Sequence, residues 1–280
     1  MKRIAYDHII AFAEAVLAKA GVEPYSANAV AAGLGETSLR GVDSHGVRLL
    51  PHYVRSVESG RKNPRPNFVF ERRFPALGTL RADHALGLAA GAKAIDHCMD
   101  MAEVYGLGAV AVVDSSHAGA MAASALRAAK RGYIALAFTH ADSFVVPYDG
   151  IRPYFGTNPI CMAAPRVEED PFCLDMATST IAWNKVLAAR AQAAPLGPGQ
   201  AADESGAETT DAFAAASLLP SGAYKGYGLG AMVEVFSGIL TGMGFGPTIP
   251  AMYTAPMDQP RRLGQFYMAL RIDSCVDAES

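Results

Sequence analysis

The sequence contains few cysteines, and they follow none of the spacings that bind metals or form redox pairs. The four cysteines among 280 residues are Cys98, Cys161, Cys173 and Cys275, and no two of them form a C-x-x-C pair. Such wide spacing excludes a disulfide scaffold and favours reduced thiols in a cytoplasmic protein. H-x-H, H-E-x-x-H and D-x-D patterns are also absent, so no metal site is predicted.

Three common nucleotide-binding and hydrolase motifs are missing. No G-x-G-x-x-G follows a predicted strand and opens a helix, because Gly106-Leu-Gly108 leads into a strand instead. There is no G-x-x-x-x-G-K-[ST] and no G-x-S-x-G. These absences exclude an ordinary Rossmann dehydrogenase, a P-loop enzyme and an α/β-hydrolase as judged by their signatures.

The sequence also lacks blocks of basic residues and long apolar runs. With 24 Lys and Arg against 27 Asp and Glu, the net charge is −3 and no basic cluster indicates a nucleic-acid partner. No apolar run reaches the roughly 18 residues of a membrane span. The apolar run near the N-terminus is interrupted by Asp7, His8 and Glu14, which predicts an amphipathic helix rather than a signal peptide.

What is present is a compact, alternating pattern of helices and strands. Hydrophobic residues make up 51% of the chain, which indicates a globular core. The second helix is expected to follow Pro24, with Ser26 as its N-cap, and residues 193–210 are expected to form a loop. Helices are predicted over 7–20, 26–39, 50–59, 87–105, 121–130, 182–191 and 228–240, and strands over 78–83, 109–113, 132–139, 160–164, 172–174 and 265–272. Strands and helices alternate from about residue 76, which predicts an α/β fold.

The most informative segment is GAVAVVDSSHAGA, residues 108–120. A short β-branched run stops at a polar turn that contains His117, and an Ala-rich helical stretch follows. Ligands of open α/β sheets bind near the ends of strands, and imidazole readily moves protons near neutral pH. His117 is therefore a candidate catalytic residue, although a role as a helix cap or as a partner of a loop carbonyl also fits the pattern.

Other polar residues follow strands in the same way. Asp142 and Asp175 come after predicted strands, and Asn158 lies in the GTNP turn. Four such loops are expected to converge at one edge of the sheet. A Ser–His–Asp hydrolase built from Ser44 or Ser115 remains open, although no nucleophile elbow frames either serine. Plain structural roles also remain open, such as backbone hydrogen bonding for the histidine of the SHG turn and solvation for the lysine of YKGYG.

Five short motifs in order carry a resemblance to a known family. They are RGVDSHG at 40–46, SSHAG at 115–119, VVP and GTNP at 145–147 and 156–159, DMATS at 175–179 and YKGYGL at 224–229. Together they resemble the malate/L-lactate/ureidoglycolate dehydrogenase family of 2-hydroxy-acid dehydrogenases. Three further segments are most similar to the ureidoglycolate dehydrogenase branch, namely HADSFVVP, IAWNKVLAAR and the late MY…RRLGQ.

The resemblance implies a fold and a reaction. It implies an α/β, non-Rossmann NAD- or NADP-binding domain over residues 76–250, with a mixed sheet flanked by helices. A smaller domain would comprise the N-terminal helices of residues 1–75 and the C-terminal elements of residues 251–280. The family further implies a homodimer that transfers a hydride between the nicotinamide and a small 2-hydroxy or 2-oxo acid.

The resemblance also assigns site residues by motif. His117 would be the general acid/base, with Asp142 orienting its ring and Ser44 and His45 beside the substrate. Arg48 would contact the substrate carboxylate. The cofactor would contact Asp175, Met176, Ala177, Lys225, Asn158 and Thr157.

Two departures from the family pattern keep alternatives open. Leu49 stands where the family usually has an arginine, and the chain stops at residue 280, before the tail that relatives usually carry. These departures leave room for a catalytically impaired relative that binds a ligand or a partner. A third hypothesis keeps the family and changes the reaction to reduction of a ketimine or cyclic imine.

Overall fold

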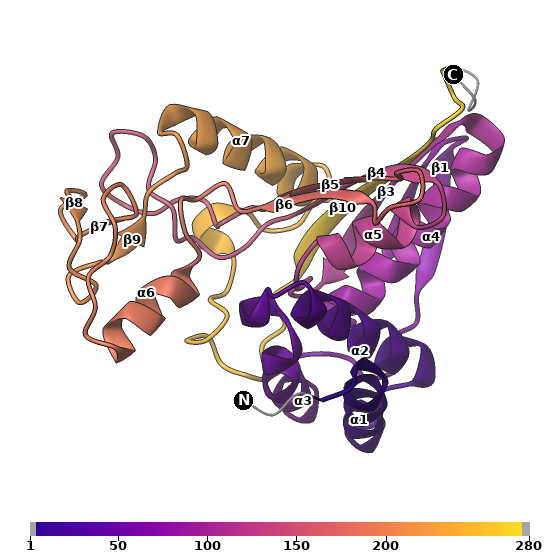
Figure 1. The fold of residues 1–280 in the computed structure, drawn as a ribbon, viewed down its shortest axis with the longest axis horizontal. Helices are drawn as coiled ribbons and strands as arrows, with labels where there is room; N and C mark the ends of the chain where they lie inside the picture. The colour runs from indigo at the N-terminus through magenta and orange to yellow at the C-terminus, as the bar shows by residue number, and fades with distance from the viewer. Residues whose placement is uncertain (1–3, 276–280) are drawn as a thin grey trace.

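The computed structural model describes residues 4–275, and its N-terminal part is a small helical layer. The layer comprises α1 (Tyr6–Lys19), α2 (Pro24–Leu39), two short 3₁₀ turns, η1 (Asp43–His45) and η2 (Val47–Leu49), and α3 (Leu50–Glu58). These helices share an apolar core that also contains Leu86 and Leu88 from the start of the next helix. Figure 1 shows them packed below one end of the main sheet.

The predicted N-cap of α2 is wrong by three residues. Glu23, not Ser26, caps the helix, and its carboxylate accepts the N–H groups of Tyr25 and Ser26 at 2.8 and 2.7 Å. The reason is Pro24, which occupies the first helical position because it has no N–H to satisfy and its φ angle suits a helix. The cap therefore falls on the residue that precedes the proline.

The body of the protein is a seven-stranded mixed sheet with helices on both faces, as the fold prediction requires. Its strand order is β1-β2-β3-β10-β4-β5-β6, and β2 and β3 are parallel while the other neighbours are antiparallel. Helices α4 (Gly87–Tyr105) and α5 (Ala122–Ala129) cover one face, and α7 (Tyr224–Glu234) lies over the other (Figure 1). The strands are β1 (Val69–Phe74), β2 (Leu77–Arg81), β3 (Leu107–Ser115), β4 (Tyr133–Thr139), β5 (Ile160–Ala164), β6 (Phe172–Met176) and β10 (Leu263–Arg271).

Strand β10 does not lie where the domain prediction puts it. It is the central strand of the main sheet, paired with β3 on one side and β4 on the other, rather than part of the smaller domain. The segment before it does contact the N-terminal layer, because Arg61 donates to the carbonyls of Met252, Ala255 and Pro256 at 2.7 Å. The boundaries at residues 75 and 250 stay a prediction.

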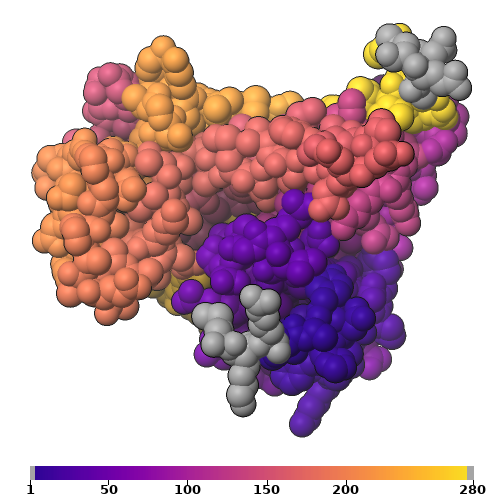
Figure 2. Space-filling view, in the orientation of Figure 1, coloured from indigo at the N-terminus to yellow at the C-terminus, as the bar shows by residue number. Residues whose placement is uncertain are grey.

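A second, smaller unit contains the segment expected to be a loop. It comprises α6 (Trp183–Ala191) and a three-stranded sheet of β7 (Ala201–Ala202), β8 (Glu208–Thr209) and β9 (Ser217–Leu218), in the order β8-β7-β9. Strands of two residues leave no periodic pattern in a sequence, so the prediction of a plain loop over 193–210 missed β7 and β8. In Figure 2 this unit and the N-terminal layer form two lobes on either side of a hollow.

Helix α7 begins earlier than predicted and continues into a π-helical turn, η3 (Val235–Ile239). It begins against the end of β6, where a Cβ on Gly226 would lie 2.8 Å from the Thr178 carbonyl oxygen. Only glycine permits this close approach. Among the helices within residues 4–275, none is long and apolar enough to cross a membrane.

Candidate active site

A small cavity gathers most of the residues that the motifs single out. Its volume is about 80 Å³, which suits a ligand of a few heavy atoms. It is lined by Ser44, His45, Leu49, His117, Ala141, Asp142, Phe144, Thr157, Ala182, Trp183, Asn184, Met252 and Tyr253. Five predicted site residues, Ser44, His45, His117, Asp142 and Thr157, thus meet at one place, although they are far apart in the sequence.

A larger cavity of about 540 Å³ lies elsewhere, between β2, β3 and η3. Its walls are largely apolar, and two of its arginines are paired, Arg81 with Glu71 and Arg262 with Asp114. It is lined by no histidine and by none of the predicted site residues. The small cavity is therefore the candidate active site despite its size.

The turn after β3 holds His117 in a fixed position. The Ser116 hydroxyl donates to the Ala85 carbonyl at 2.8 Å, and the Gln265 amide on β10 donates to the Ser116 carbonyl at 3.1 Å. A Cβ on Gly87 would lie 2.3 Å from the His117 carbonyl oxygen, so only glycine fits at the start of α4. This close packing immobilises the backbone that carries the imidazole.

The imidazole of His117 is held at one nitrogen. The Tyr53 hydroxyl lies 2.9 Å from Nδ1, and the ring of His45 stacks on it with centroids 5.7 Å apart and an angle of 23°. Within residues 4–275, Nε2 has no hydrogen-bond partner and is left beside the cavity. The Ser44 hydroxyl is 3.0 Å from Nδ1 of His45, so these two residues form a second short polar chain.

The surroundings of His117 favour a neutral ring. Burial, followed by the nearby His45, Lys62, Arg261 and His52, holds the pKa of His117 well below its usual value. Burial also lowers the pKa of His45. A neutral imidazole accepts a proton, so the site is prepared for a general base.

Asp142 lines the cavity but does not orient His117, contrary to the expected role. Its carboxylate pairs with the buried Arg261 guanidinium, and it also accepts the backbone N–H of Met252 at 3.0 Å. Both side chains of the ion pair are less than a tenth exposed. The carboxylate therefore fixes the segment that carries Met252 and Tyr253, and a tyrosine takes the role expected of it at His117.

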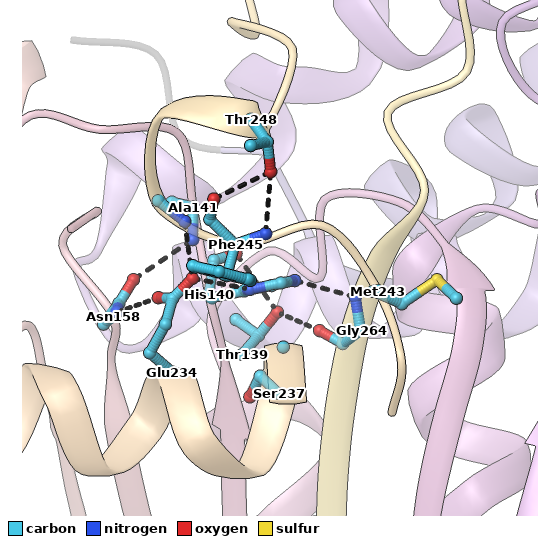
Figure 3. Close-up of polar contacts among 12 residues, drawn as sticks. Thr139, His140, Ala141, Asn158, Glu234, Ser237, Met243, Phe245, Thr248 and Gly264 are labelled. Atoms are coloured by element: carbon cyan, nitrogen blue, oxygen red, sulfur yellow. Dashed lines mark hydrogen bonds and ion pairs between the residues drawn. The ribbon is translucent and has the colours of Figure 1, made fainter. Parts of the chain in front are cut away.

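Asn158 is committed to a buried network, shown in Figure 3. Its amide donates to the Glu234 carboxylate at 2.6 Å and to the Gly230 carbonyl at 3.0 Å, and its oxygen accepts the N–H of Ala141 at 3.2 Å. Glu234 in turn lies 3.2 Å from Nδ1 of His140. Asn158 thus anchors Ala141, which lines the cavity, and its predicted contact with a cofactor stays a prediction.

The remaining predicted cofactor residues divide into two groups. The Thr178 N–H donates to the Thr157 carbonyl at 2.9 Å, and the Ser221 N–H donates to the Thr178 carbonyl at 2.9 Å. These bonds bring Met176, Ala177 and Thr157 close to the start of α7, where Lys225 is exposed. Asp175 points the other way, because its carboxylate accepts the N–H of Ala122 at the start of α5, at 2.8 Å.

Known proteins that are similar to this chain identify its family. The family model of malate/L-lactate dehydrogenase matches residues 4–280. The chain belongs to the malate/L-lactate dehydrogenase family. Ureidoglycolate dehydrogenase (NAD(+)) of Escherichia coli O157:H7 is 35% identical over 268 residues, which is 96% of this chain and 76% of that protein. The (2R)-3-sulfolactate dehydrogenase (NADP(+)) of Chromohalobacter salexigens is 36% identical, covering 84% of this chain and 71% of that protein.

A solved structure of another family member has the same fold. Δ1-piperideine-2-carboxylate reductase from Pseudomonas syringae superposes with a TM-score of 0.91 at 29% identity, and the match covers 99% of this chain and 84% of that chain. This relative is named as a reductase, whereas the two relatives above are named as dehydrogenases.

The position of Leu49 is where this member of the malate/L-lactate dehydrogenase family departs from the expected pattern. Leu49 is buried and lines the cavity, whereas Arg48 is exposed and does not. Arg48 is nevertheless close enough to act on Tyr253, which lines the cavity, and its predicted contact with the substrate carboxylate stays a prediction.

Sequence reasoning missed several residues around His117. Tyr53, Lys62, Arg261 and Tyr253 come from α3, from the segment that follows it and from the segment before β10. Tyr53 and Lys62 stand in no motif and follow no predicted strand, and Tyr253 and Arg261 belong to the late MY…RRLGQ motif, to which no site role was assigned. The pair Arg61-Lys62 after Gly60 was visible only as two adjacent cations, and folding alone brings them to the site.

Proposed function

We propose that this protein is an NAD- or NADP-dependent oxidoreductase that moves a hydride between the nicotinamide and C2 of a small 2-hydroxy acid. The observation that carries the proposal is the His117 imidazole, with one nitrogen held by Tyr53 and the other free beside the cavity. Membership of the malate/L-lactate dehydrogenase family and the named activities of the two dehydrogenase relatives support the same reaction.

His117 is the general base in the oxidation direction. The substrate hydroxyl gives its proton to Nε2, while the C2–H bond breaks and its electron pair leaves C2 as a hydride. The C–O bond becomes C=O, and the imidazolium later releases the proton to solvent. A nicotinamide bound beside the cavity supplies the hydride acceptor. In the reduction direction the imidazolium donates its proton to the forming alkoxide.

Ser44 and His45 are proposed to contact the substrate oxygens. If the Ser44 hydroxyl donates to Nδ1 of His45, the other nitrogen of His45 carries a proton that it can donate to a carboxylate or hydroxyl oxygen. Arg61, Lys62 and Arg261 make the surroundings of the cavity positive, and a positive site attracts an anionic substrate.

The start of α7 fits the phosphates of a dinucleotide. The helix has eleven residues and no capping side chain at its N-terminus, and Lys225 is exposed in its first turn. The partial positive charge of a helix N-terminus and a lysine ammonium both favour a phosphate. Thr157, Met176 and Ala177 lie between this helix end and the cavity, so we propose that the cofactor spans that distance. Nothing in this region selects NAD over NADP.

Reduction of a ketimine or cyclic imine is the second candidate. The observation in its favour is the close structural match to Δ1-piperideine-2-carboxylate reductase. The same imidazole would then donate a proton to the imine nitrogen while the hydride is delivered to the carbon.

A homodimer in a reducing compartment is also part of the proposal. Helix α7 and η3 carry an exposed apolar stripe, and all four cysteines are free. The stripe consists of Tyr224, Leu229, Val235, Ile239 and Leu240, which are each 40–63% exposed. Exposed apolar patches of this kind often form subunit interfaces. Light scattering on the eluting protein measures the oligomeric state, and a monomeric mass would overturn this part.

The experiment that tests the function follows the absorbance of reduced nicotinamide. Purified protein is mixed with NAD or NADP and, in turn, ureidoglycolate, malate, lactate, sulfolactate and a cyclic imine. Turnover of a hydroxy acid that disappears in His117→Gln is the expected result. Turnover of the imine alone would support the second candidate instead.

Silence across the panel would overturn the proposal. If the silent protein is folded and still binds reduced nicotinamide, as followed by its fluorescence, it is an impaired relative. A Leu49→Arg variant then tests whether restoring the arginine restores turnover.

A further inference from the structure

Tyr53 lies between the candidate base and a buried lysine. It sits on α3 and is 1% exposed, with its hydroxyl 2.9 Å from Nδ1 of His117. Nζ of Lys62 lies 4.1 Å from the centre of the Tyr53 ring. Three side chains thus form a row from the protein interior to the cavity, and the reaction proposed above uses only the last of them, His117.

Lys62 is the unusual member of this row. It is 3% exposed, and within residues 4–275 its Nζ is buried without a hydrogen-bond partner. Its backbone N–H donates to the Ser56 carbonyl at 3.0 Å, which fixes the residue against the end of α3. Burial, followed by the nearby Arg261 and Arg61, holds the pKa of Lys62 well below its usual value, so a charged amine at this position is costly.

The two arginines near the site differ from Lys62 in this respect. Arg61 donates to three backbone carbonyls, and Arg261 pairs with Asp142. Their charges are therefore offset by nearby oxygen atoms. Within the described residues, Nζ of Lys62 has no hydrogen-bond partner and lies over the Tyr53 ring, so when protonated it acts on its neighbours with less compensation than the two arginines.

We propose that Tyr53 and Lys62 are positioning residues for the reaction of His117. In this arrangement the Tyr53 oxygen accepts a hydrogen bond from the Nδ1–H group of His117. The proton of the neutral ring therefore stays on Nδ1, and Nε2 is unprotonated and directed to the cavity. Lys62 keeps the imidazole uncharged until the substrate proton arrives, because a cation nearby disfavours a second one. The inference rests on the proposed function, in which His117 is the base.

The groups that face His117 come from every segment packed against it. They are His45 from η1, His52 and Tyr53 from α3, Arg61 and Lys62 after α3, Asp142 after β4, and Tyr253 and Arg261 before β10. Because Arg261 and Asp142 largely cancel, Lys62 is the cation of this set whose removal should change the charge at His117 most directly.

Tyr53→Phe tests the hydrogen bond. The variant keeps the ring and the cation–π contact and removes only the hydroxyl. We expect kcat to fall about ten-fold with the KM for the cofactor unchanged, since losing one hydrogen bond to a catalytic group has this effect. Tyr25→Phe is the matched control, because the Tyr25 hydroxyl has no partner within the described residues and Lys93 lies 4.8 Å from its ring centre.

Lys62→Met tests the charge and keeps a side chain of similar length. The imidazole should then take up a proton at higher pH, so the rising limb of kcat/KM for oxidation should move about one unit towards alkaline pH. Lys93→Met is the matched control and should leave the limb in place. Lys62→Arg keeps the charge and should restore the wild-type profile.

A readout that needs no turnover separates the possible failures. Histidine ring carbons labelled with ¹³C give the titration of each imidazole by NMR, and His117→Gln identifies the signal of His117. A rise in the His117 titration midpoint in Lys62→Met supports the inference even if no substrate is found. An unchanged midpoint overturns the role of Lys62.

The kinetic result then stands on its own. If Tyr53→Phe turns over at the wild-type rate with the wild-type pH profile, the role of Tyr53 is wrong although the proposed function stands. If His117→Gln retains turnover, the proposed function itself fails.

Discussion

Two histidines that follow neighbouring parts of the main sheet differ in how their rings are hydrogen-bonded. His117 follows β3 and His140 follows β4, and these two strands flank β10. The His140 ring is used at both nitrogens, because Nδ1 lies 3.2 Å from Glu234 and Nε2 accepts the N–H of Gly264 at 2.9 Å (Figure 3). Among the residues that the structure describes, the His117 ring is hydrogen-bonded at one nitrogen, Nδ1.

The difference shows how the same residue type serves structure in one place and chemistry in another. Around His140, the Glu234 carboxylate also accepts from Asn158 and Gly246, so this carboxylate joins three separate segments to α7. Around His117, burial and the cations Lys62 and Arg261 disfavour a charged ring, and Nζ of Lys62 is buried without a hydrogen-bond partner within the described residues. A saturated imidazole holds segments together, and one with a free nitrogen is able to exchange a proton.

Exchanging each histidine for glutamine should give the largest contrast. His117→Gln is expected to lower turnover roughly 10³-fold, the usual contribution of a general base, with a free energy of unfolding close to that of the wild type. His140→Gln is expected to lower the free energy of unfolding by about 3 kcal/mol, because the buried Glu234 carboxylate and the Gly264 N–H each lose a hydrogen-bond partner. Urea unfolding and initial rates measure the two effects, and equal losses of stability would erase the distinction.

The comparison also shows what the sequence was able to predict. Each histidine follows a buried β-branched or apolar strand and precedes a polar turn, so both were visible as polar residues at strand ends. Their different roles depend on their partners, Glu234 for His140 and Tyr53 for His117. Both partners lie on helices far away in the sequence. The motif SSHAG distinguished His117 only through the family resemblance.

Asp142→Asn tests the buried ion pair between Asp142 and Arg261, which contributes both to stability and to the shape of the cavity. The variant keeps the shape of the side chain and leaves Arg261 without its counter-charge, so we expect a loss of about 2 kcal/mol in the free energy of unfolding. Because Met252 and Tyr253 line the cavity and depend on this carboxylate, KM for the substrate should rise about ten-fold. If KM stays unchanged while stability falls, Asp142 has no part in shaping the site.

Lowering the pH should give a smaller effect, a loss of stability that comes from His52 on the His117 side of the molecule. Burial, followed by Lys62 and the nearby arginines, lowers the pKa of His52 to about 4 in the folded protein, whereas an unfolded histidine titrates near 6.5. The unfolded chain therefore binds the proton first, and stability should fall as the pH drops from about 6.5 towards 4. Urea unfolding at several pH values should show this fall, and it should be shallower in His52→Gln. An equally steep fall in that variant would assign the effect to other groups.

Helices and strands were predicted well where their periodicity was strong. The ranges of α4 and β5 agree with the prediction to the residue, because both are long or strongly apolar segments with clear boundaries. The two-residue strands of the small sheet were missed, and the cap of α2 was misplaced because Pro24 shifted it to Glu23. The position of β10 in the middle of the sheet was also missed, because local sequence patterns predict a strand but not which strands it pairs with.

That central strand has a consequence for how the chain folds. The two halves of the main sheet, β1-β2-β3 and β4-β5-β6, are joined only through β10, which comes near the end of the described residues. During synthesis, β3 and β4 therefore emerge long before the strand that pairs with both of them. Until β10 inserts, each half presents an open edge that other strands can pair with. Folding that depends on such distant contacts is slow, and the unjoined halves are the state in which this protein is most prone to aggregate.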